Sequence, residues 1–487
     1  TSIKWMLDCF WHSRTLQKGK FMMTATAAAP ITEDLLRRYD VAGPRYTSYP
    51  TADRFVEAFS DADYRQALTL RRTGAVAMTL PLSLYVHIPF CESLCYYCAC
   101  NKIITKHHDR AVEYLRYLTR EVELHVQHLG QGQTVSQLHL GGGTPTFLTD
   151  DELRQLMSML RRNFVFAANG EYSIEVDPRT IDNTRLDTLA ELGFNRLSFG
   201  VQDFDPVVQK SVHRIQPFEQ VAALVHAARE RKFESINMDL IYGLPNQSPE
   251  SFDRTLAQVN SLRPERIALY AYAHLPERFK PQRRIDSLEI PSAGAKVSML
   301  SHSMKAFMDA GYVYVGMDHF ALPDDALAIA KRQGRLHRNF QGYSTQPDCD
   351  LIGLGVSSIG RIGATYSQNA KTLEEYYDYL DQGRFPIVRG LALSRDDVLR
   401  RSVIMSLMCQ GNVLFESMEL GYLINFKNYF AAEMEVLKTL QDQDLVEVDD
   451  HQIQVTEMGW FFVRAVAMVF DKYLQTDRTR AKFSKII

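Results

Sequence analysis

The sequence has no excess of basic residues. Its 55 Lys and Arg residues are offset by 58 Asp and Glu residues, which leaves a formal charge of −3 at pH 7. A protein that is drawn to nucleic acid or to anionic membranes by its overall charge carries a positive field instead. We therefore expect no nucleic-acid partner.

Long apolar runs are also missing. No stretch approaches the roughly 20 residues that a transmembrane helix needs, so we expect no membrane span. Near the N-terminus the only apolar run is interrupted by Asp8, which argues against a secretory signal and, with few arginines, against an organelle-targeting sequence. We interpret residues 1–23 as an extension or tag outside the fold, with Met22 or Met23 as the natural start.

Cysteine is scarce, with seven residues in the chain, yet four of these lie within ten positions. Such crowding does not suit a disulfide framework, so we expect a reducing compartment, the cytoplasm. Cys91, Cys95 and Cys98 have the spacing C-x3-C-x2-C, which lets three thiolates hold three corners of a four-iron, four-sulfur cluster and leaves one iron open. The alternative is a structural zinc site completed by Cys100, although zinc sites usually divide their ligands into two separated pairs.

The pattern after Ser83 predicts the fold. Short β-branched or aromatic runs alternate with longer amphipathic segments, which is typical of repeated β-α units and a parallel sheet. The predicted strands are 82–89, 135–140, 172–176, 196–201, 236–241 and 267–272, with 312–316 as a candidate seventh. The predicted helices between them include 110–129, 150–163, 218–232 and 248–262. Six or seven units favour an incomplete (β/α) barrel over a closed eight-stranded one.

Polar and glycine residues follow these strands directly. They are 141–145 (Gly-Gly-Gly-Thr-Pro) after the second strand, Glu175 and Asp177 after the third, Gln202 and Asp203 after the fourth, and Asp239 and Tyr242 at the fifth. In a barrel these positions converge on one mouth, together with the cysteine loop. We expect the active site there. Residues 353–360 contain three glycines in a spacing that does not fit a dinucleotide-binding loop, and we interpret them as a late strand and turn that close the mouth.

The chain changes character near residue 391. Helices are predicted at 396–408, 426–440 and 457–473, and a hairpin at 445–455, which together resemble a winged helix. From 394 to 475 there are 7 Lys or Arg residues against 13 Asp or Glu residues, a balance that is wrong for binding a phosphate backbone. We therefore predict a barrel at 81–390, a helical, winged-helix-like cap domain at 391–487, and an N-terminal helical and extended segment at 24–80 that contacts the active site.

With its cysteine motif after a strand and its Gly-Gly-Gly-Thr-Pro segment, the chain resembles the radical S-adenosylmethionine (radical SAM) enzymes. Glycines without a Cβ let the backbone approach a ligand closely. The resemblance implies that S-adenosylmethionine binds the open iron of a [4Fe-4S] cluster. An electron from the cluster then cleaves it to a 5'-deoxyadenosyl radical, which takes a hydrogen atom from the substrate.

Six further segments narrow this resemblance. They are 43–51 (Gly-Pro-Arg-Tyr-Thr-Ser-Tyr-Pro-Thr), 98–102 (Cys-Ala-Cys-Asn-Lys), 199–203 (Phe-Gly-Val-Gln-Asp), 213–216 (His-Arg-Ile-Gln), 237–245 (Asn-Met-Asp-Leu-Ile-Tyr-Gly-Leu-Pro) and 351–360 (Leu-Ile-Gly-Leu-Gly-Val-Ser-Ser-Ile-Gly). Through these segments the chain is similar to the oxygen-independent coproporphyrinogen III oxidases, a family within that superfamily. The resemblance implies conversion of two propionates of coproporphyrinogen III to vinyl groups, with loss of two carbon dioxides, to give protoporphyrinogen IX. A haem-binding chaperone of the same superfamily is the alternative.

The resemblance also implies two bound molecules of S-adenosylmethionine and a set of site residues. Those that match S-adenosylmethionine positions are Tyr85, Tyr97, Gly142, Gly143, Thr144, Glu175, Gln202, Arg214, Asp239, Ala273 and Ile359, and Cys91, Cys95 and Cys98 match the cluster ligands. A substrate with four carboxylates needs basic partners in its cavity, and Arg45 and Arg361 are the candidates. We further expect an electron donor, a terminal electron acceptor, and a monomer.

Overall fold

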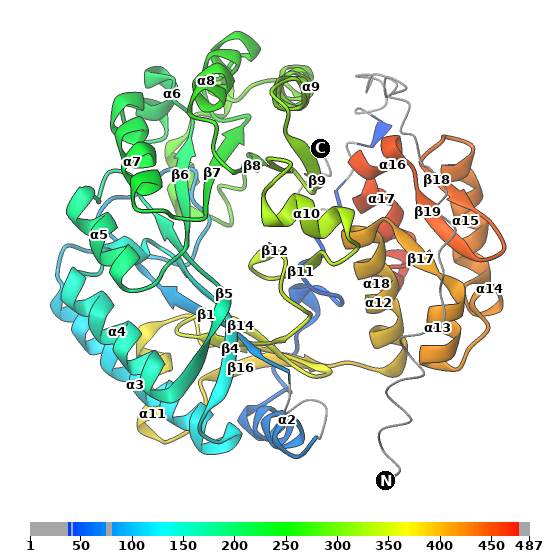
Figure 1. Ribbon diagram of the computed structural model, residues 1–487, viewed down its shortest axis with the longest axis horizontal. Coiled ribbons are helices and arrows are strands. Elements are labelled where there is room, and N and C mark those ends of the chain that lie inside the picture. Colours follow the sequence, from blue (N-terminus) through cyan, green and yellow to red (C-terminus); the bar gives the residue numbers. More distant parts are fainter. Residues whose placement is uncertain (1–37, 40–41, 75–79, 477–487) are drawn as a thin grey trace. The chain divides into compact units, whose positions relative to one another are not determined.

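The computed structural model describes residues 38–39, 42–74 and 80–476 of the chain. The interpretation of residues 1–23 lies outside this range. A twelve-stranded sheet dominates the described part, in the order β16-β15-β14-β13-β1-β4-β5-β6-β7-β8-β10-β9. The order has two free ends, so the sheet curves without closing (Figure 1).

Seven neighbouring strands of this sheet, from β13 to β8, run parallel. They are β13 (Asp350–Leu354), β1 (Leu82–Ile88), β4 (Gln133–Gly142), β5 (Phe164–Val176), β6 (Arg196–Gln202), β7 (Ser235–Tyr242) and β8 (Arg266–Ala271). The remaining strands of the sheet are β9 (Val313–Gly316), β10 (His319–Ala321), β14 (Ile359–Ile362), β15 (Thr365–Asn369) and β16 (Ile387–Ala392). The six predicted strands from 82 to 272 are confirmed to within a few residues, except that β5 begins eight residues earlier.

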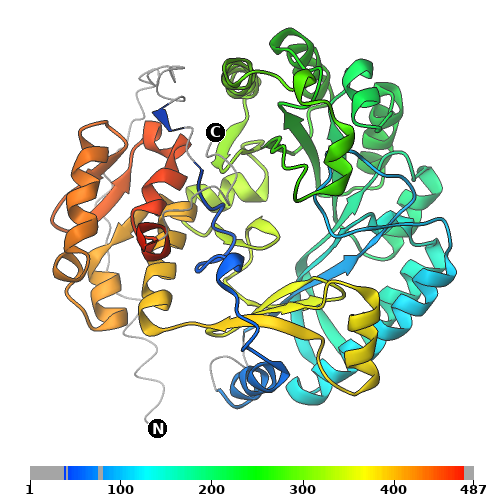
Figure 2. The ribbon, with the colours of Figure 1, turned by 180° about the vertical axis from the view of Figure 1, so that it is seen from behind.

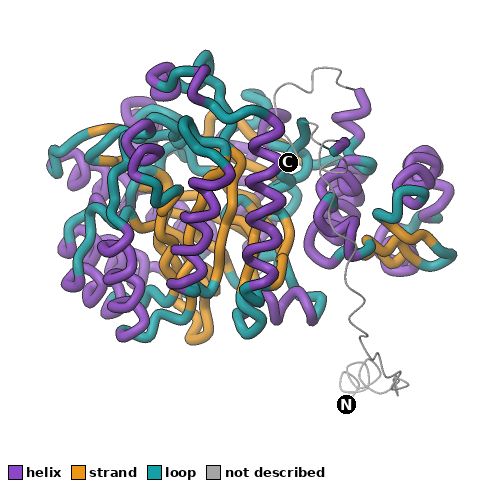
Figure 3. The backbone as a smooth tube through the Cα atoms, turned by 90° about the horizontal axis from the view of Figure 1, so that it is seen from above, coloured by secondary structure: helices purple, strands orange, loops and turns teal. Residues whose placement is uncertain are grey.

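Helices cover the outer face of the parallel strands, and Figure 3 shows them outside the strands from a second direction. They are α3 (Asp109–Leu129), α4 (Asp150–Asn163), α5 (Asn183–Glu191), α6 (Pro206–Ser211), α7 (Phe218–Glu230), α8 (Pro249–Leu262), α9 (Ala293–Asp309) and α11 (Leu373–Asp381). The short helix α10 (Ala326–Arg332) lies beside β9 instead, and its Leu327 faces the interior of the barrel. In α4, Leu153, Leu156, Met157 and Leu160 are buried, the spacing of one helix face. Its N-terminus is fixed by a capping box between Thr149 and Glu152. The four predicted helices between 110 and 262 are confirmed.

The candidate seventh strand at 312–316 exists, but its predicted place in the fold is wrong. Strand β9 is the outermost strand and pairs antiparallel with β10, which itself pairs antiparallel with β8. Met317 and Asp318 have φ values of 45° and 67°, so the chain reverses in a tight turn between the two strands. The seventh parallel strand is instead β13, which lies beside β1. The interpretation of 353–360 as strand and turn is confirmed.

The C-terminal part combines helices with a three-stranded sheet in the order β17-β19-β18. Its elements are α12 (Arg395–Gln410), β17 (Asn412–Leu414), α13 (Phe415–Tyr422), α14 (Phe426–Tyr429), α15 (Ala431–Gln441), β18 (Val446–Val448), β19 (Gln452–Val455), α16 (Glu457–Phe461), α17 (Val463–Met468) and α18 (Lys472–Thr476). The predicted hairpin is confirmed. The predicted helices at 426–440 and 457–473 are broken, because Phe430 and Phe462 leave helical backbone angles while their rings are fully buried.

The N-terminal segment contacts both the large sheet and the C-terminal helices. Val56 forms a β-bridge with Gly390, and Arg464 Nε donates to the Pro44 carbonyl at 2.7 Å. Figure 2 shows this segment, in blue, running between the two regions. It includes the 3-10 helix η2 (Ala52–Arg54) and α2 (Asp61–Thr73). The domain boundaries at 80 and 391 stay predictions.

Glu121 of α3 anchors the turn that follows β13. Its side chain is almost fully buried and accepts hydrogen bonds from Gly355 N–H (2.7 Å), the Tyr376 hydroxyl (2.7 Å) and Asn369 Nδ2 (2.6 Å). Burial raises the pKa of Glu121 from 4.5 to about 7, although these three donors oppose that shift. The carboxyl group therefore ties the outer helix to a turn next to the mouth of the barrel.

We expect Glu121→Ala to lower the free energy of unfolding by about 3 kcal/mol, because three buried donors lose their acceptor. Urea unfolding followed by circular dichroism measures this loss. A group whose pKa is raised by folding contributes stability below its unfolded-state pKa and loses it as pH rises through the folded-state value. The loss should therefore be larger near about pH 5.5 than near about pH 8. The exposed neighbour Glu123→Ala is the control, and equal effects of both changes would contradict the prediction.

Candidate active site

A cavity of about 170 Å³ lies at the carboxyl ends of the parallel strands. The sequence-predicted residues that line it are Cys91, Cys95, Tyr97, Cys98, Gly142, Gly143, Thr144, Glu175, Gln202, Arg214 and Asp239. The structure thus brings together residues that are spread over 149 positions of the chain. Their individual roles stay predictions, but their convergence follows from parallel strands that all end at one edge.

Short backbone pairings hold the cysteine loop. Cys91 ends β2 (Phe90–Cys91), which pairs in parallel with β3 (Ile103–Ile104) on the far side of the loop. Thr105 N–H also donates to the Cys91 carbonyl at 3.0 Å. The thiols of Cys91 and Cys95 are mostly buried, and Thr144 Oγ1 donates to Cys91 Sγ at 3.3 Å. The loop therefore presents its thiols to the cavity from a fixed frame.

The glycine segment packs directly against this loop. Gly143 N–H donates to the Ile88 carbonyl at 2.8 Å, and a Cβ on Gly143 would lie 2.8 Å from the backbone of Pro89. Gly142 has φ of 116°, and a Cβ there would lie 2.7 Å from the ring of His87. Both positions therefore require glycine, the first for the close approach and the second also for its backbone conformation.

Two carboxylates face the cavity from β5 and β7, the strands on either side of β6. Glu175 accepts a hydrogen bond from Gly142 N–H at 3.1 Å, and its other oxygen lies 3.3 Å from His139 Nε2. Asp239 accepts from Ser198 Oγ at 3.0 Å and Asn237 Nδ2 at 2.9 Å. Burial, with a smaller contribution from the charge of Glu175, raises the pKa of Asp239 to about 6. Each carboxylate keeps capacity to accept hydrogen bonds from a ligand's hydroxyl groups.

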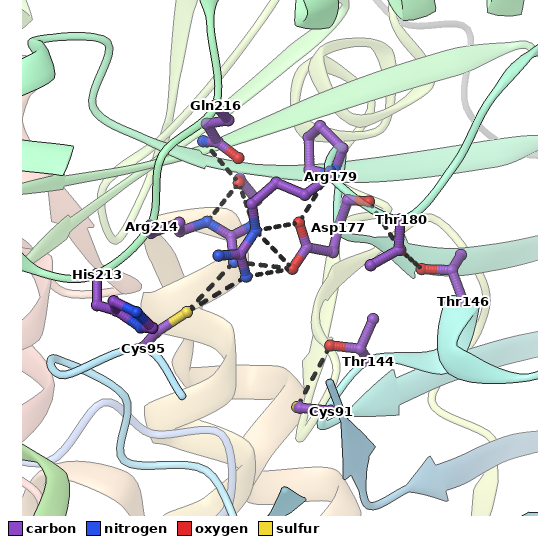
Figure 4. A network of polar contacts seen from close by, with 12 residues as sticks. Cys91, Cys95, Thr144, Thr146, Asp177, Arg179, Thr180, His213, Arg214 and Gln216 are labelled. Carbon is purple, nitrogen blue, oxygen red and sulfur yellow. Dashed lines mark hydrogen bonds and ion pairs between the residues drawn. The ribbon is translucent and has the colours of Figure 1, made fainter. Parts of the chain in front are cut away.

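A charged network occupies the rim beside Cys95 (Figure 4). Asp177 Oδ2 accepts from Arg179 Nη2 at 2.7 Å and from Arg214 Nη1 at 3.1 Å. Burial acts to raise the pKa of Asp177, but the two guanidinium groups outweigh it and hold the pKa below its ordinary value. Arg214 also donates to the Gly200 carbonyl through Nε and Nη2, so most of its donors are already engaged.

Arg179 is a charged residue of the site that the sequence analysis missed. It lines the cavity and follows a predicted strand in the sequence Asp177-Pro178-Arg179. A charged pair after a strand end was the available signal. However, an arginine in a loop is most often a surface residue. Only the fold shows that its side chain turns inward.

Several predicted residues lie beside the cavity rather than on its wall. Tyr85 stacks on His139 with ring centroids 5.9 Å apart, behind Glu175. The carbonyl of Ala273 shares Gln282 Nε2 as a donor with the carbonyl of Tyr97. The backbone of Ile359 lies against Gly353, whose Cα is paired with that of Tyr85.

The two arginines predicted to bind substrate lie in different places. Arg361 forms an ion pair with Asp348 at 2.7 Å, and its Cα is opposite Leu351 near the amino end of β13, away from the mouth. Arg45 forms an ion pair with Asp318 at 3.1 Å and lies over the ring of Tyr270 at 5.3 Å. The fold therefore favours Arg45 over Arg361 as a residue near the barrel interior.

A second cavity of about 170 Å³ lies within the barrel and shares Glu175, Ser198 and Asp239 with the first. Its walls are alternate, inward-facing residues of β4 to β8. The hairpin of β11 (His337–Asn339) and β12 (Gly342–Ser344) contributes Gly342 and Tyr343 to it. Figure 1 shows this hairpin inside the curve of the sheet. The interior is therefore polar and adjoins the cysteine site.

Two features are absent from the residues that the structure describes. None of the helices there is both long enough and apolar enough to cross a membrane. No group of three or more His, Cys, Asp or Glu side chains is arranged in 38–39, 42–74 or 80–476 to hold a single metal ion. A cluster needs a different donor set, in which thiols on one loop border an open space. Cys91, Cys95 and Cys98 fit that requirement, since all three line the same cavity.

Comparison with known proteins places the chain in a family. Residues 85–259 match the model of the radical SAM superfamily, and residues 393–462 match that of the HemN C-terminal domain. The chain is 50% identical to an oxygen-independent coproporphyrinogen III oxidase of Pseudomonas aeruginosa, with 93% of this chain and 98% of that protein aligned. It is 48% identical to the Escherichia coli protein of the same name, again over 93% and 98%.

A solved structure agrees with these sequence matches. Coproporphyrinogen III oxidase (HemN) from Escherichia coli, described as a radical SAM enzyme, superposes with a TM-score of 0.84 at 47% identity and covers 89% of this chain and all of its own. The matches favour the oxidase interpretation over the haem chaperone and the zinc module, since they extend over nearly the whole chain. The chain belongs to the oxygen-independent coproporphyrinogen III oxidases, a family within the radical SAM superfamily.

Proposed function

We propose that this protein converts two propionate side chains of coproporphyrinogen III to vinyl groups without oxygen and so forms protoporphyrinogen IX. The observation that carries the proposal is one cavity lined by Cys91, Cys95 and Cys98 together with the Gly142–Gly143 backbone. That cavity belongs to a chain half identical to named oxidases. Membership of the superfamily implies a [4Fe-4S] cluster and S-adenosylmethionine.

Each propionate loses one hydrogen atom, one carbon dioxide and one electron. When bound, the cluster and S-adenosylmethionine would supply the 5'-deoxyadenosyl radical that accepts the hydrogen atom. Removal of hydrogen from the β-carbon leaves a substrate radical, and loss of carbon dioxide with one electron leaves the vinyl group. The proposal therefore needs an electron donor for the cluster and an electron acceptor for the substrate radical.

The residues of the chain bind and orient the reactants. Cys91, Cys95 and Cys98 would hold the cluster through their thiolates, since all three line one cavity. Glu175 and Asp239 accept hydrogen bonds from ribose hydroxyls, which fits their positions on the cavity wall. We propose two S-adenosylmethionine molecules, because the resemblance implies two and most of the matched residues line one cavity. The six described cysteines are free thiols, which supports a reducing cytoplasmic setting. We also propose a monomer.

Positive charge near the second cavity, the inner cavity of the barrel, supports a polycarboxylate substrate. Arg338 of β11 is 4% exposed and has no ion-pair partner within the described residues, and its Nη1 is buried without a hydrogen bond. It lies 4.6 Å from the ring centroid of Tyr343, and its Nε donates to the Arg45 carbonyl at 3.3 Å. Tyr343 and Tyr270, the two rings beneath Arg338 and Arg45, both line the inner cavity. A buried, unpaired cation is costly, and an anionic substrate offsets that cost.

The function is tested by an anaerobic assay of the reconstituted protein with S-adenosylmethionine, a reductant and coproporphyrinogen III. We expect protoporphyrin after oxidation of the products, with 5'-deoxyadenosine formed in step. Cys95→Ala should lose the cluster and both products, whereas Cys100→Ala should keep the cluster. An intact cluster that yields neither product would overturn the proposal and favour the haem chaperone.

We expect Arg45→Ala to raise the KM for coproporphyrinogen roughly tenfold, equivalent to about 1.4 kcal/mol, with cluster content unchanged. Arg338→Gln should act in the same direction because it removes the unpaired cation. Arg361→Ala is the comparison, and a smaller effect is expected because Arg361 lies near the amino end of β13, away from the mouth. Steady-state kinetics on folded variants measure all three. An unchanged KM in Arg45→Ala and Arg338→Gln would exclude this charge from substrate binding.

The glycine segment gives a further test. Gly143→Ala should reduce the iron bound after reconstitution, because its Cβ would meet the Pro89 backbone and displace the cysteine loop. Iron content and visible absorption measure the loss. Gly421→Ala is the matched control, since a Cβ there meets open space. Full iron content in Gly143→Ala would show that the close approach is not needed to hold the cluster.

A further inference from the structure

Arg179 has a place in the site that neither the predicted ligand set nor the reaction explains. Its side chain is four-fifths buried, with 19% exposed. Its Nε lies 3.0 Å from Asp177 Oδ1 and its Nη2 lies 2.7 Å from Asp177 Oδ2, a two-bond contact that fixes the plane of the guanidinium group. In that plane, Nη2 also donates toward Cys95 Sγ at 3.6 Å (Figure 4).

A second guanidinium group reaches the same sulfur from a different segment. Arg214 Nη1 donates toward Cys95 Sγ at 3.5 Å, and the same nitrogen donates to Asp177 Oδ2 at 3.1 Å. One carboxylate thus holds two cations against one thiol, which leaves one net positive charge beside Cys95. By contrast, Cys91 receives a neutral donor, the hydroxyl group of Thr144.

The guanidinium group of Arg179 is not needed to form the turn on which it lies. Thr180 N–H donates to the Asp177 carbonyl at 3.0 Å, and Arg179 N–H donates to Asp177 Oδ1 at 3.1 Å. These backbone donors remain when the side chain is replaced. The inward direction of the guanidinium group therefore calls for another explanation than local folding.

We propose that Arg179, oriented by Asp177, acts with Arg214 to raise the reduction potential of the cluster bound through Cys95. Adding one electron makes the cluster and its thiolates more negative, so nearby cations and N–H donors to sulfur stabilise the reduced form more than the oxidised form. Burial strengthens this effect, because the charges are poorly screened. Arg179 acts on the cluster through Cys95, by its positive charge and its N–H donor to the sulfur, and so makes the cluster easier to reduce.

This inference rests on the proposed function, because it assumes that the cluster is present. The test is a redox titration followed by electron paramagnetic resonance, on reconstituted protein without S-adenosylmethionine or substrate. The variants are Arg179→Gln, which removes the charge, and Arg179→Lys, which keeps the charge but not the planar two-bond contact. Arg154→Gln is the matched control, since it removes an exposed arginine on the outer helix α4 that pairs with Glu191.

We expect a more negative midpoint potential in Arg179→Gln, a smaller shift in Arg179→Lys and no shift in Arg154→Gln. An unchanged potential in Arg179→Gln, with full iron and sulfide content, would overturn the proposal. If Arg179→Gln does not keep its cluster, the midpoint potential of Arg179→Lys is the test. A potential in Arg179→Lys equal to that of the unaltered protein would then overturn the proposal. Failure of the unaltered protein to bind a cluster would instead overturn the proposed function, so the two failures are distinguishable.

Discussion

The site depends on one constraint, the parallel pairing of β1 with β4 on one side and β13 on the other. The pairing places Ile88 opposite Gly142 and Val86 opposite Leu354, so the three strands end together. The cysteine loop, the glycine segment and the turn held by Glu121 follow these ends and therefore meet. A shift of one residue in either pairing would turn alternate side chains to the other face of the sheet. The register is thus as important for the chemistry as the identity of the cysteines.

Two buried carboxylates near the carboxyl ends of these strands show how neighbouring groups determine whether a carboxyl group is ionised. Glu121 and Asp177 are both buried, yet the pKa of Glu121 is raised and that of Asp177 is lowered. Neutral donors surround Glu121, whereas two guanidinium groups contact Asp177. Desolvation disfavours the charged form in both cases, and only a full opposite charge outweighs it. The ionised groups therefore lie beside Cys95. The turn after β13 is held by Glu121, whose carboxyl group is partly protonated near neutral pH because its pKa is about 7.

The sequence predicted the strands, the outer helices and the convergence of the motif residues, because hydrophobic periodicity and strand-end chemistry are local signals. It mistook the place of β9, because the two central positions of the reversing turn are Met317 and Asp318 rather than the Asn-Gly pair that commonly marks such a turn. It also missed Arg179 and offered Arg361, since loop arginines look alike in a sequence. Their difference lies in register: Arg179 follows the carboxyl end of β5, whereas Arg361 lies opposite the amino end of β13.

The incomplete barrel leaves an open, polar interior. In a closed eight-stranded barrel, inward side chains pack into layers and fill the interior. Here the sheet continues into β14, β15 and β16 on one side and β10 and β9 on the other instead of closing. Its inward residues include Gln137, His139, Asn237 and Arg266, which line open space next to the cysteine site. The wall shared at Glu175 and Asp239 places this polar interior directly next to the cysteine loop.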